Sequence, residues 1–377
     1  LVRTGGIGNC QFINVESEFA ALSVAIGASA AGSRAYTATS SQGLLFMTEA
    51  VYNAAGLGLP IVMTIGNRAI GAPINIWNDH SDSMALRDAG WVQLYAETNQ
   101  EAVDLHIQAF RLAEQLSVPV MVCEDGFILT HAYERIDIPD PEEVDSFLPA
   151  FEPVQILDPS EPITIGAMVG PEAFAEVRYL AHHKHLRAID VIPELSAEFS
   201  LLFGREAGGL IRPYRAEDAE TVVVGLGSVM GTVKDTVDEM RDGGVSIGAV
   251  TIVSFRPFPL LALRTALKKA KRVIVIEKCL ADGLGGIVVG SVRMSLRGHS
   301  TPIYTIIAGL GGRPIPKASL LRAFGEAARD KIDDPHFLDL DWEVVDRELA
   351  RGKEKRRSGP IAENILRQRG LVGGKPV

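Results

Sequence analysis

The chain has 377 residues, enough for two or three domains, and 47% of them are hydrophobic, which is ample for buried cores. Its formal net charge is −10, and the first 340 residues contain no basic stripe, which argues against nucleic acid and an anionic membrane surface as partners. The basic run 351–357 (RGKEKRR) is interpreted as a solvated helix end or a tail docked on an acidic neighbour. No apolar run reaches membrane-spanning length, and no secretory signal is visible.

The cysteines Cys10, Cys123 and Cys279 are far apart in the sequence, and none belongs to a C-x-x-C pair. By itself this chain therefore cannot hold a four-cysteine iron–sulfur cluster or zinc site. A sparse, odd number of cysteines is typical of a reducing compartment, so we expect a cytoplasmic protein.

Strand and helix patterns alternate along the first block of the chain, up to about residue 135. Such alternation, with continuously apolar strands, is typical of a parallel sheet covered on both faces. Ser40 and Ser41 are good N-cap residues for the second predicted helix. The predicted strands are 11–15, 35–39, 61–65 and 118–124, and the predicted helices are 16–31, 44–55 and 100–115.

Six prolines and several acids between residues 136 and 162 predict an interdomain linker. A second α/β block follows at 163–312, and the polar, helical segment 313–377 is interpreted as a tail that packs on partner chains. The turn Gly225-Leu226-Gly227-Ser228 predicts either a tight strand–helix connection or a phosphate site at a helix N-terminus. In this block the predicted strands are 221–225, 245–251 and 272–277, and the predicted helix is 231–241.

The most informative segment follows the predicted strand Leu59–Ile65, which ends in Gly66-Asn67-Arg68 and a long polar loop. In an open α/β sheet, ligands bind beyond the carboxyl ends of the strands. A guanidinium offers a planar, permanently charged fork for a carboxylate. Arg68 is therefore a candidate substrate clamp, and a structural Arg–Asp pair in a surface loop is the alternative.

Two acids, Glu16 and Glu18, open the first predicted helix, where two positions correspond to about 200° of rotation. Only one of them can face a given site, and both also suit a helix N-terminus electrostatically. Ser41 lacks the G-x-S-x-G elbow of a nucleophile, so N-capping is the preferred interpretation.

Two histidine-containing segments invite a metal interpretation. His80 lies beside Asp79 and Asp82, but one histidine among adjacent acids gives too few well-spaced ligands. In the run 182–185 (HHKH) adjacent side chains point apart, so an exposed helix end is preferred. We predict no metal site in this chain.

The chain from Val15 to Asp88 closely resembles the α chain of heteromeric pyruvate:ferredoxin oxidoreductases, which are thiamine-diphosphate enzymes of the 2-oxoacid:acceptor oxidoreductase superfamily. The resemblance extends over nearly the whole chain. It is carried by FINVESEFAALSVAIGASAA at 12–31, TATSSQGLL at 37–45, TIGNRAIGAPINIWNDHSDSMALRD at 64–88, SFRPF at 254–258 and IAGLGGR at 307–313.

The resemblance implies an α/β fold of two doubly wound parallel-sheet domains. The first, 1–135, is implied to bind the cofactor's pyrimidine, and the second, 163–312, to be a transketolase C-terminal-like domain that binds no cofactor. The family's P-I-T-P motif, expected a few dozen residues upstream of Val15, is absent here, and Leu1–Gly8 reads as a helix end with a glycine-rich stop. We therefore expect the N-terminal part of the first domain to be missing from this sequence.

The resemblance also implies roles for individual residues. Glu18 matches the glutamate that hydrogen-bonds N1′ of the thiamine pyrimidine, and Ser41 is assigned to the cofactor-binding set with it. Arg68 matches the substrate arginine, and its neighbour Asn67 is expected to bind the substrate or orient the loop. Gly71 stands where many pyruvate enzymes carry Ser or Ala, which suggests a wider substrate pocket.

Thiamine-diphosphate enzymes hold the diphosphate through Mg²⁺ with a G-D-G motif and a later asparagine. The nearest match here is Glu124-Asp125-Gly126, and no asparagine lies between Gly126 and Asn364. The resemblance therefore implies a β subunit that supplies the diphosphate and Mg²⁺ half of a shared site. It also implies γ and δ (ferredoxin-like) subunits, [4Fe-4S] clusters on partner chains, ferredoxin or another electron acceptor, and coenzyme A as co-substrate.

The implied reaction is the oxidative decarboxylation of pyruvate to acetyl-CoA and CO2, with electrons passed to ferredoxin. Related complexes act on other 2-oxoacids, such as oxalate or phenylglyoxylate, and an NAD-linked form is possible. A non-catalytic scaffold subunit and a transketolase-like transferase are the alternatives from other classes. Glu18 and Arg68 argue against the scaffold.

Overall fold

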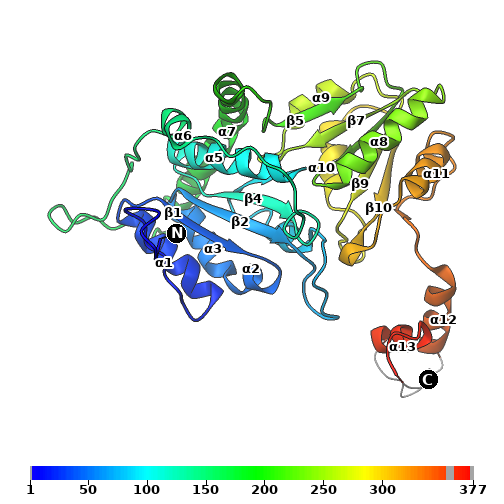
Figure 1. Cartoon of the computed structure of the whole chain (residues 1–377), viewed down its shortest axis with the longest axis horizontal. Helices are drawn as coiled ribbons and strands as arrows, with labels where there is room; N and C mark the ends of the chain where they lie inside the picture. The colour runs from blue at the N-terminus through cyan, green and yellow to red at the C-terminus, as the bar shows by residue number, and fades with distance from the viewer. Residues whose placement is uncertain (1, 354–360, 374–377) are drawn as a thin grey trace.

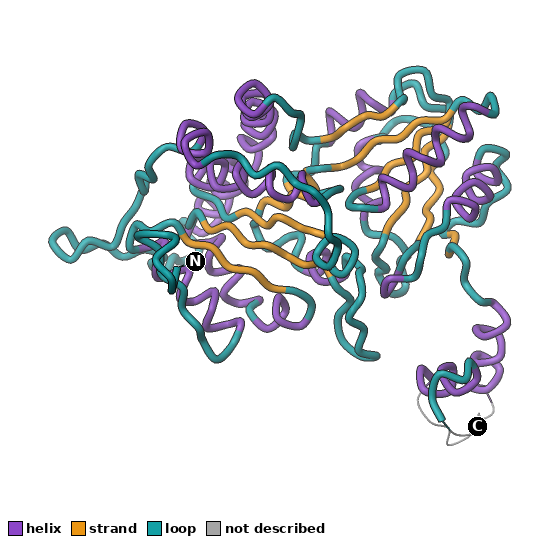
Figure 2. Tube along the Cα trace, viewed as in Figure 1, coloured by secondary structure: helices purple, strands orange, loops and turns teal. Residues whose placement is uncertain are grey.

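The computed structural model describes residues 2–353 and 361–373, which form two α/β units that lie side by side (Figure 1). Each unit has a central sheet with helices on both faces (Figure 2). The first sheet consists of β1 (Ala35–Thr39), β2 (Ile61–Asn67), β3 (Val92–Tyr95), β4 (Val120–Asp125) and β8 (Ser254–Arg256). The second consists of β5 (Ile211–Tyr214), β6 (Thr221–Gly225), β7 (Ile247–Ile252), β9 (Arg272–Glu277), β10 (Ile303–Ile307) and β11 (His336–Phe337).

The helices connect these strands and cover both faces of each sheet. Helices α1, α2 and α3 contact one another below the first sheet, whereas α5 packs on β2 and β4 from the opposite face (Figure 1). The helices are α1 (Glu18–Ala30), α2 (Gln42–Phe46), α3 (Thr48–Leu57), α4 (Ser81–Ala85), α5 (Asn99–Leu116), α6 (Pro141–Phe147), α7 (Phe174–Phe203), α8 (Val229–Asp242), α9 (Leu260–Leu267), α10 (Val288–Ser295), the 3-10 turn η1 (Leu310–Gly312), α11 (Lys317–Ala327), α12 (Trp342–Lys353) and α13 (Ile361–Gln368).

The strand order is β1-β2-β4-β3-β8 in the first sheet and β11-β10-β9-β6-β7-β5 in the second. Neighbouring strands run parallel except at one edge of each sheet, where β8 is antiparallel to β3 and β5 is antiparallel to β7. The predicted α/β class with parallel sheets covered on both faces is confirmed, and the antiparallel edges are a feature that the sequence analysis did not predict.

The first residues depart from the prediction. Residues 2–9 form turns and bends rather than a helix end. The predicted strand 11–15 has no regular secondary structure and pairs with no strand among the described residues, so this prediction is wrong.

Local capping explains where the first helix begins. The hydroxyl of Ser17 accepts a hydrogen bond from the backbone N–H of Ala20 at 3.2 Å, so α1 starts at Glu18. Glu16 therefore precedes the helix, and the predicted comparison of Glu16 and Glu18 around one helix does not apply. The predicted helix 44–55 is divided into α2 and α3 at Met47.

Packing moves the boundary between the units away from the predicted linker. Helix α7 packs on α5, and its apolar face, which includes Val191, Leu195 and Phe199, joins the core formed by α5 and the first sheet. The strand β8, although it comes later in the chain, extends that same sheet. The first unit thus reaches through residue 203, and the segment 136–162 contains the short helix α6 rather than separating two units.

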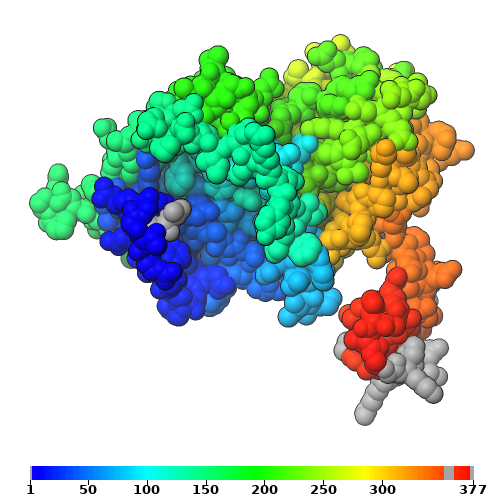
Figure 3. Space-filling view, in the orientation of Figure 1, coloured from blue at the N-terminus to red at the C-terminus, as the bar shows by residue number. Residues whose placement is uncertain are grey.

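The C-terminal segment is only partly a tail. Helix α11 packs on α8, and β11 pairs with β10, so residues up to 337 belong to the second unit. Helices α12 and α13 project away from the rest of the chain (Figure 3). Part of the basic run, residues 354–357, lies outside the described residues. Among the described helices, none combines the length and apolarity that crossing a membrane requires.

A buried carboxylate at the end of β4 joins the two units. Asp125 accepts hydrogen bonds from the ammonium of Lys278 at 2.9 Å and from the backbone N–H of Ser228 at 3.0 Å, and its other oxygen lies 2.5 Å from Nε2 of His80. Burial alone would raise the pKa of Asp125, but the charges of Lys278 and His80 hold this pKa well below its ordinary value. Because Ser228 and Lys278 belong to the second unit, Asp125 fixes one unit against the other.

A second charged cluster crosses the same interface. Glu97 accepts hydrogen bonds from Lys234 at 2.7 and 2.8 Å, and Arg212 donates to Glu101 at 2.7 Å. Both acids are buried; Glu97 precedes α5 and Glu101 lies in its first turn, whereas both cations come from the second unit. The interface is therefore held by paired charges as well as by the shared apolar core.

The Asp125 cluster predicts a large cost when its cation is removed. Lys278→Met leaves a buried carboxylate short of its main counter-charge, so the free energy of unfolding should fall by about 3 kcal/mol in urea titrations. Asp125→Asn in the Lys278→Met background should recover part of this loss, because the unpaired charge is then gone.

Lys271→Met is the matched control, since Lys271 pairs with Glu220 on the surface at 2.6 Å. It should cost less than about 1 kcal/mol, as is typical of exposed ion pairs. Equal losses for the two lysine variants would contradict the assigned role of the Asp125 cluster.

Candidate functional site

Arg68 lies at the carboxyl edge of the first sheet, directly after β2. Its side chain is half-buried, and its Nε is fully buried without a hydrogen-bond partner among the described residues. No acid in the described part of the chain forms an ion pair with its guanidinium. The predicted alternative, a structural Arg–Asp pair, is thus not found there, and the guanidinium is available to an anion.

A second buried carboxylate, Asp82, organises the segment that carries Arg68. One of its oxygens accepts the backbone N–H groups of Ser41 at 2.8 Å and Arg68 at 3.1 Å. The other accepts the side-chain amide of Asn67 and the backbone N–H of Ser83, each at 2.8 Å. Burial raises the pKa of Asp82 to about 6, although these donors act in the opposite direction.

Ser41 stands at the N-cap position of α2, but its side chain makes no capping bond. Its hydroxyl instead donates to the carbonyl of Ala69 and contacts the side chain of Gln42. The residue is buried and has a φ of 52°, a region that non-glycine residues rarely adopt. The capping interpretation is wrong, because the hydroxyl is used to tie the β1–α2 turn to the residue after Arg68. Its assignment to cofactor binding stays a prediction.

Asn67 is buried in a polar network beneath Arg68. Its amide donates to Asp82 and, at 2.6 Å, to the hydroxyl of Ser83, which lies 2.8 Å from the hydroxyl of Tyr95. These contacts favour the second of its two expected roles, the orientation of the loop. A direct contact between Asn67 and a substrate remains a prediction.

Glu18 reaches the same edge from the first turn of α1. Its side chain is exposed and lies against Gly43, where an added Cβ would stand 2.9 Å from its Cγ and 3.0 Å from its Oε1. That Cβ would also stand 2.7 Å from Oγ1 of Thr39. Only a glycine at position 43 therefore leaves this carboxylate where it is. The turn 39–43 thus connects Glu18 to the Arg68 segment.

Gly71 lies in the exposed loop after Arg68 and has a φ of +77°. No atom lies within 4 Å of the position that its Cβ would take. Within this chain, backbone conformation explains the glycine better than pocket width does, and its role in substrate selection stays a prediction.

The loop beyond Gly71 leans on the second unit. The side chain of Asn75 donates to the carbonyl of Gly311 at 3.1 Å. A Cβ on Gly311 would stand 2.6 Å from Nδ2 of Asn75, and a Cβ on Gly312 would stand 2.3 Å from Cβ of Trp77. The two segments of the sequence that contain NIW and GLGG therefore meet in space.

The Glu124-Asp125-Gly126 segment has a structural explanation. The carboxylate of Asp125 is occupied by Lys278, His80 and Ser228, and a Cβ on Gly126 would stand 2.4 Å from the carbonyl oxygen of Asn67. The Gly225–Ser228 turn likewise receives this carboxylate rather than an external phosphate at the start of α8. The tight-connection interpretation of that turn accounts for these contacts.

The run 182–185 lies within α7 and not at a helix end. Lys184 donates to the carbonyl of Ser117, the C-cap of α5, at 3.1 Å, and His185 contacts the carbonyl of Gly90 at 3.0 Å. The helix-end interpretation is wrong, because these side chains dock α7 against the first unit.

The comparisons with known proteins show the family of this chain. The family described as pyruvate flavodoxin/ferredoxin oxidoreductase, thiamine diphosphate-binding, matches residues 1–196, and pyruvate:ferredoxin oxidoreductase core domain II matches residues 219–319. The chain belongs to this family. Pyruvate synthase subunit PorA of Methanosarcina barkeri is 45% identical over 350 residues, which cover 90% of this chain and 87% of that protein.

A further curated relative and a solved structure are also similar to this chain. Ketoisovalerate oxidoreductase subunit VorA of Pyrococcus abyssi is 42% identical, over 87% of this chain and 84% of that protein. A 2-oxoglutarate:ferredoxin oxidoreductase from Magnetococcus marinus superimposes with a TM-score of 0.61 at 19% identity, over 86% of this chain. The chain spans 58% of that structure's chain, and the likeness shows the fold alone.

The sequence did not single out Asp82, Gly43 or Asp125 for the roles that they have in this family member. Asp125 is the last residue of β4, whereas Gly43 and Asp82 lie in the short helices α2 and α4, which follow β1 and β2 in the chain. A list of acids in these loops does not show which carboxylates are buried, so this part of the site required the structure.

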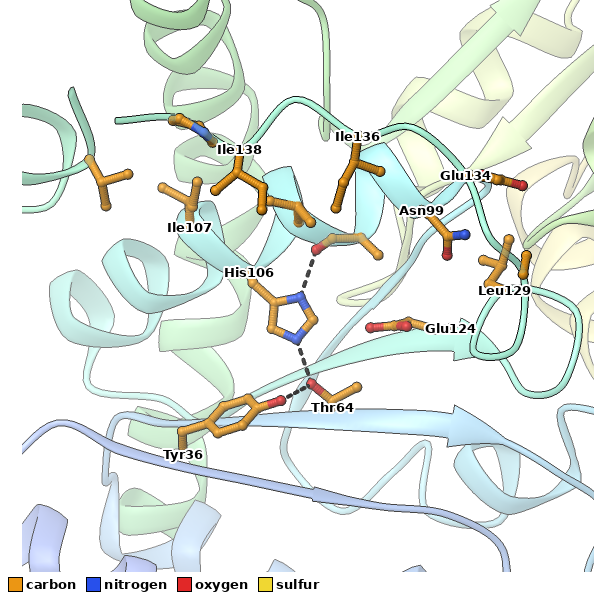
Figure 4. Close-up of a pocket in the computed structure, with 15 residues that line it drawn as sticks. Tyr36, Thr64, Asn99, His106, Ile107, Glu124, Leu129, Glu134, Ile136 and Ile138 are labelled. Atoms are coloured by element: carbon orange, nitrogen blue, oxygen red, sulfur yellow. Dashed lines mark hydrogen bonds between the residues drawn. The ribbon is translucent and has the colours of Figure 1, made fainter. Parts of the chain in front are cut away.

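A separate cavity of about 600 Å³ lies between α5, the first sheet and the segment 132–144 (Figure 4). Nδ1 of His106 lies 2.6 Å from the carbonyl of Ala102, and its Nε2 lies 2.5 Å from Oγ1 of Thr64. Burial lowers the pKa of His106, so the neutral ring donates through Nδ1 and accepts from the threonine. Glu124 faces the same cavity, and burial raises its pKa to about 6.

The raised pKa of Glu124 predicts a pH-dependent effect on stability. Its carboxyl binds a proton more tightly in the folded chain than in the unfolded one, so above pH 6 the folded state carries a cost of about 2 kcal/mol. Glu124→Gln should remove this cost and raise the free energy of unfolding at pH 7.5. The gain should vanish near pH 4, where the carboxyl is protonated in both states.

Urea titrations at the two pH values measure the difference. Glu134→Gln, which changes an exposed acid lining the same cavity, should alter the unfolding free energy by less than about 0.5 kcal/mol. A gain from Glu124→Gln that is equal at both pH values would show that burial of the charge is not its cause.

Proposed function

We propose that this chain is the α subunit of a thiamine-diphosphate-dependent oxidoreductase that converts pyruvate and coenzyme A to acetyl-CoA and CO2, with electrons passed to ferredoxin. The observation that carries the proposal is the guanidinium of Arg68, which has no acidic partner among the described residues and shares a sheet edge with Glu18. Decarboxylation of a 2-oxoacid on this cofactor requires a cation for the substrate carboxylate and a carboxyl group for the cofactor, and Arg68 and Glu18 supply these two groups.

The residues at this edge fit the pyrimidine half of thiamine diphosphate. The side chain of Glu18 is exposed. Because Gly43 has no Cβ, there is room beside it for the Glu18 carboxylate. When bound, the cofactor supplies a carbon nucleophile and an electron sink for the 2-oxo carbon. Glu18 would hold a proton at the pyrimidine N1′ and favour the imino form of the ring.

Arg68 would bind the carboxylate of the 2-oxoacid and hold it until CO2 departs. Its fork geometry suits two parallel hydrogen bonds to a carboxylate. Asp82, Ser41 and Asn67 keep the backbone at this position in place without neutralising the guanidinium, since none of them contacts it.

The division of labour between chains is also part of the proposal. The nearest match to a diphosphate motif is committed to the interface between the two units through Asp125. A β subunit would supply the Mg²⁺ and diphosphate contacts, and partner chains would carry the [4Fe-4S] clusters. The names of the relatives as subunits support such an assembly.

Pyruvate is the proposed substrate because relatives named pyruvate synthase subunit PorA are 45% and 46% identical to this chain. A branched 2-oxoacid is the second candidate, since the ketoisovalerate relative reaches 42%. The test is an assay of the assembled complex with pyruvate and with 3-methyl-2-oxobutanoate, in which the reduction of ferredoxin is measured. A higher kcat/KM for pyruvate supports the proposal. A higher kcat/KM for the branched acid would show that the branched acid is the preferred substrate.

The assignment of Glu18 predicts a loss of cofactor activation. In the assembled complex, Glu18→Gln should slow exchange of the thiazolium C2 proton by at least about a hundredfold, because an amide cannot share a proton with N1′. The measurement is NMR of deuterium incorporation after acid quench. Glu16→Gln, which lies outside α1, should exchange at nearly the wild-type rate. A wild-type rate of C2 proton exchange in Glu18→Gln would contradict the assignment.

The assignment of Arg68 predicts a loss of substrate binding and turnover. Arg68→Ala should lower transition-state stabilisation by about 2–5 kcal/mol, and Arg68→Lys should also lose activity because the fork is gone. Arg87→Ala, which changes an arginine bonded to Met84 and Asp88 in the same segment, is the control. If kcat/KM in Arg68→Ala stayed within a factor of two of wild type, another residue would hold the carboxylate.

The division of labour predicts that this chain alone binds thiamine diphosphate weakly or not at all and is colourless. Adding the β subunit should restore Mg²⁺-dependent binding. Isothermal calorimetry on the lone chain and on the mixture distinguishes the two cases. Micromolar, Mg²⁺-dependent binding by the lone chain would place the diphosphate site within this chain.

A further inference from the structure

The environment of Asp82 differs from that of the buried acids at the interface between the two units. Asp125 has a lysine partner, and Glu101 has an arginine partner. Asp82 is fully buried and is held only by uncharged donors, four N–H groups from the segments that follow β1 and β2 and from its own helix. A carboxylate with two oxygens can accept four such bonds at once.

These bonds converge on the backbone of Arg68. Asp82 accepts the N–H of Arg68 itself and the side chain of the preceding residue, Asn67. It also accepts the N–H of Ser41, whose hydroxyl donates to the carbonyl of Ala69. The N–H of Arg68 is therefore fixed to this carboxylate, and the carbonyl of the next residue, Ala69, is fixed to the turn that the carboxylate holds.

We propose that Asp82 is a positioning residue that holds Arg68 in the orientation in which its guanidinium meets the carboxylate of the 2-oxoacid. This inference rests on the proposed function of Arg68. Among the described residues, no cation forms an ion pair with Asp82. Asp82 therefore holds Arg68 through the backbone, and the guanidinium keeps its full charge for the substrate. The raised pKa of Asp82 agrees with a carboxylate that is retained at a desolvation cost.

The test uses Asp82→Asn, which preserves volume. An amide has one acceptor oxygen, so at least two of the four donors lose their partner. In the assembled complex, kcat/KM for pyruvate should fall about 10- to 100-fold, mainly through KM, since the carboxylate clamp is displaced. Exchange of the thiazolium C2 proton should stay within a factor of two, because Glu18 is not held by Asp82.

A double-mutant cycle separates positioning from general damage. In the Arg68→Ala background, Asp82→Asn should lower kcat/KM by less than about twofold further, because its effect acts through a side chain that is already absent. Losses that multiply, or a C2 exchange rate that falls together with kcat/KM, would overturn the inference.

Hydrogen exchange on the assembled complex gives a readout that does not depend on activity. Peptides that cover 64–70 should exchange faster in Asp82→Asn than in wild type. Glu277→Gln is the matched control, because Glu277 is a buried carboxylate that accepts the N–H groups of Ile287, Val288 and Val289, far from Arg68 in the sequence. It should leave exchange in 64–70 unchanged, and unchanged exchange in Asp82→Asn would contradict the proposal.

Two further outcomes are distinguishable. If Asp82→Asn does not fold, Ser41→Ala is the second variant, because it removes the hydroxyl contacts with Ala69 and Gln42 and leaves the Ser41 N–H bond to Asp82. It should raise KM in the same pattern with a smaller effect, and an unchanged KM contradicts the proposal. If the wild-type complex does not turn over any 2-oxoacid, or Arg68→Ala remains fully active, the proposed function fails. Faster exchange at 64–70 in Asp82→Asn would then still establish that Asp82 holds this segment.

Discussion

The buried carboxylate of Asp125 is the contact on which the arrangement of this chain depends. It lies at the end of a strand of the first unit and accepts hydrogen bonds from a lysine and a helix N-terminus of the second. Because both charges are removed from water, the pair is costly to separate, and the two units are held in one relative position. The fixed position of the two units also fixes the carboxyl edge of the first sheet and the loop around Asn75, which contacts the second unit.

At the carboxyl edge of the first sheet, some charged side chains have a partner of opposite charge and others do not. Acids such as Asp125 and Glu101 are paired with cations, whereas Asp82 is held by neutral donors and Arg68 has no acidic partner among the described residues. A preorganised cation in a partly desolvated site interacts strongly with an anionic substrate, because little reorganisation is needed when the substrate binds. Exposed Glu18 completes the edge and faces away from the core, where a partner chain can cover it.

The sequence predicted the parts of this architecture that depend on local pattern. Apolar strands such as 61–65 and the position of Arg68 after a strand end were predicted from hydrophobicity and sheet topology. The contacts of α7 and β8 with the first sheet were not predicted, because they join residues far apart in the chain. Nor could the sequence distinguish Asp82 and Asp125 from the exposed acids around them, since burial of a carboxylate depends on tertiary packing. Gly43 was missed because its role is to leave room for another side chain.

The central claim is that Glu18 and Arg68 form one half of a shared thiamine-diphosphate site. The most direct measurement is a cryo-electron microscopy structure of the assembled complex with the cofactor and an unreactive 2-oxoacid analogue bound. The account predicts that Glu18 lies within hydrogen-bonding distance of the pyrimidine N1′, and that the guanidinium of Arg68 contacts the anionic group of the analogue. A structure in which Arg68 pairs with an acid of a partner chain, and the analogue is bound by other residues, would contradict it.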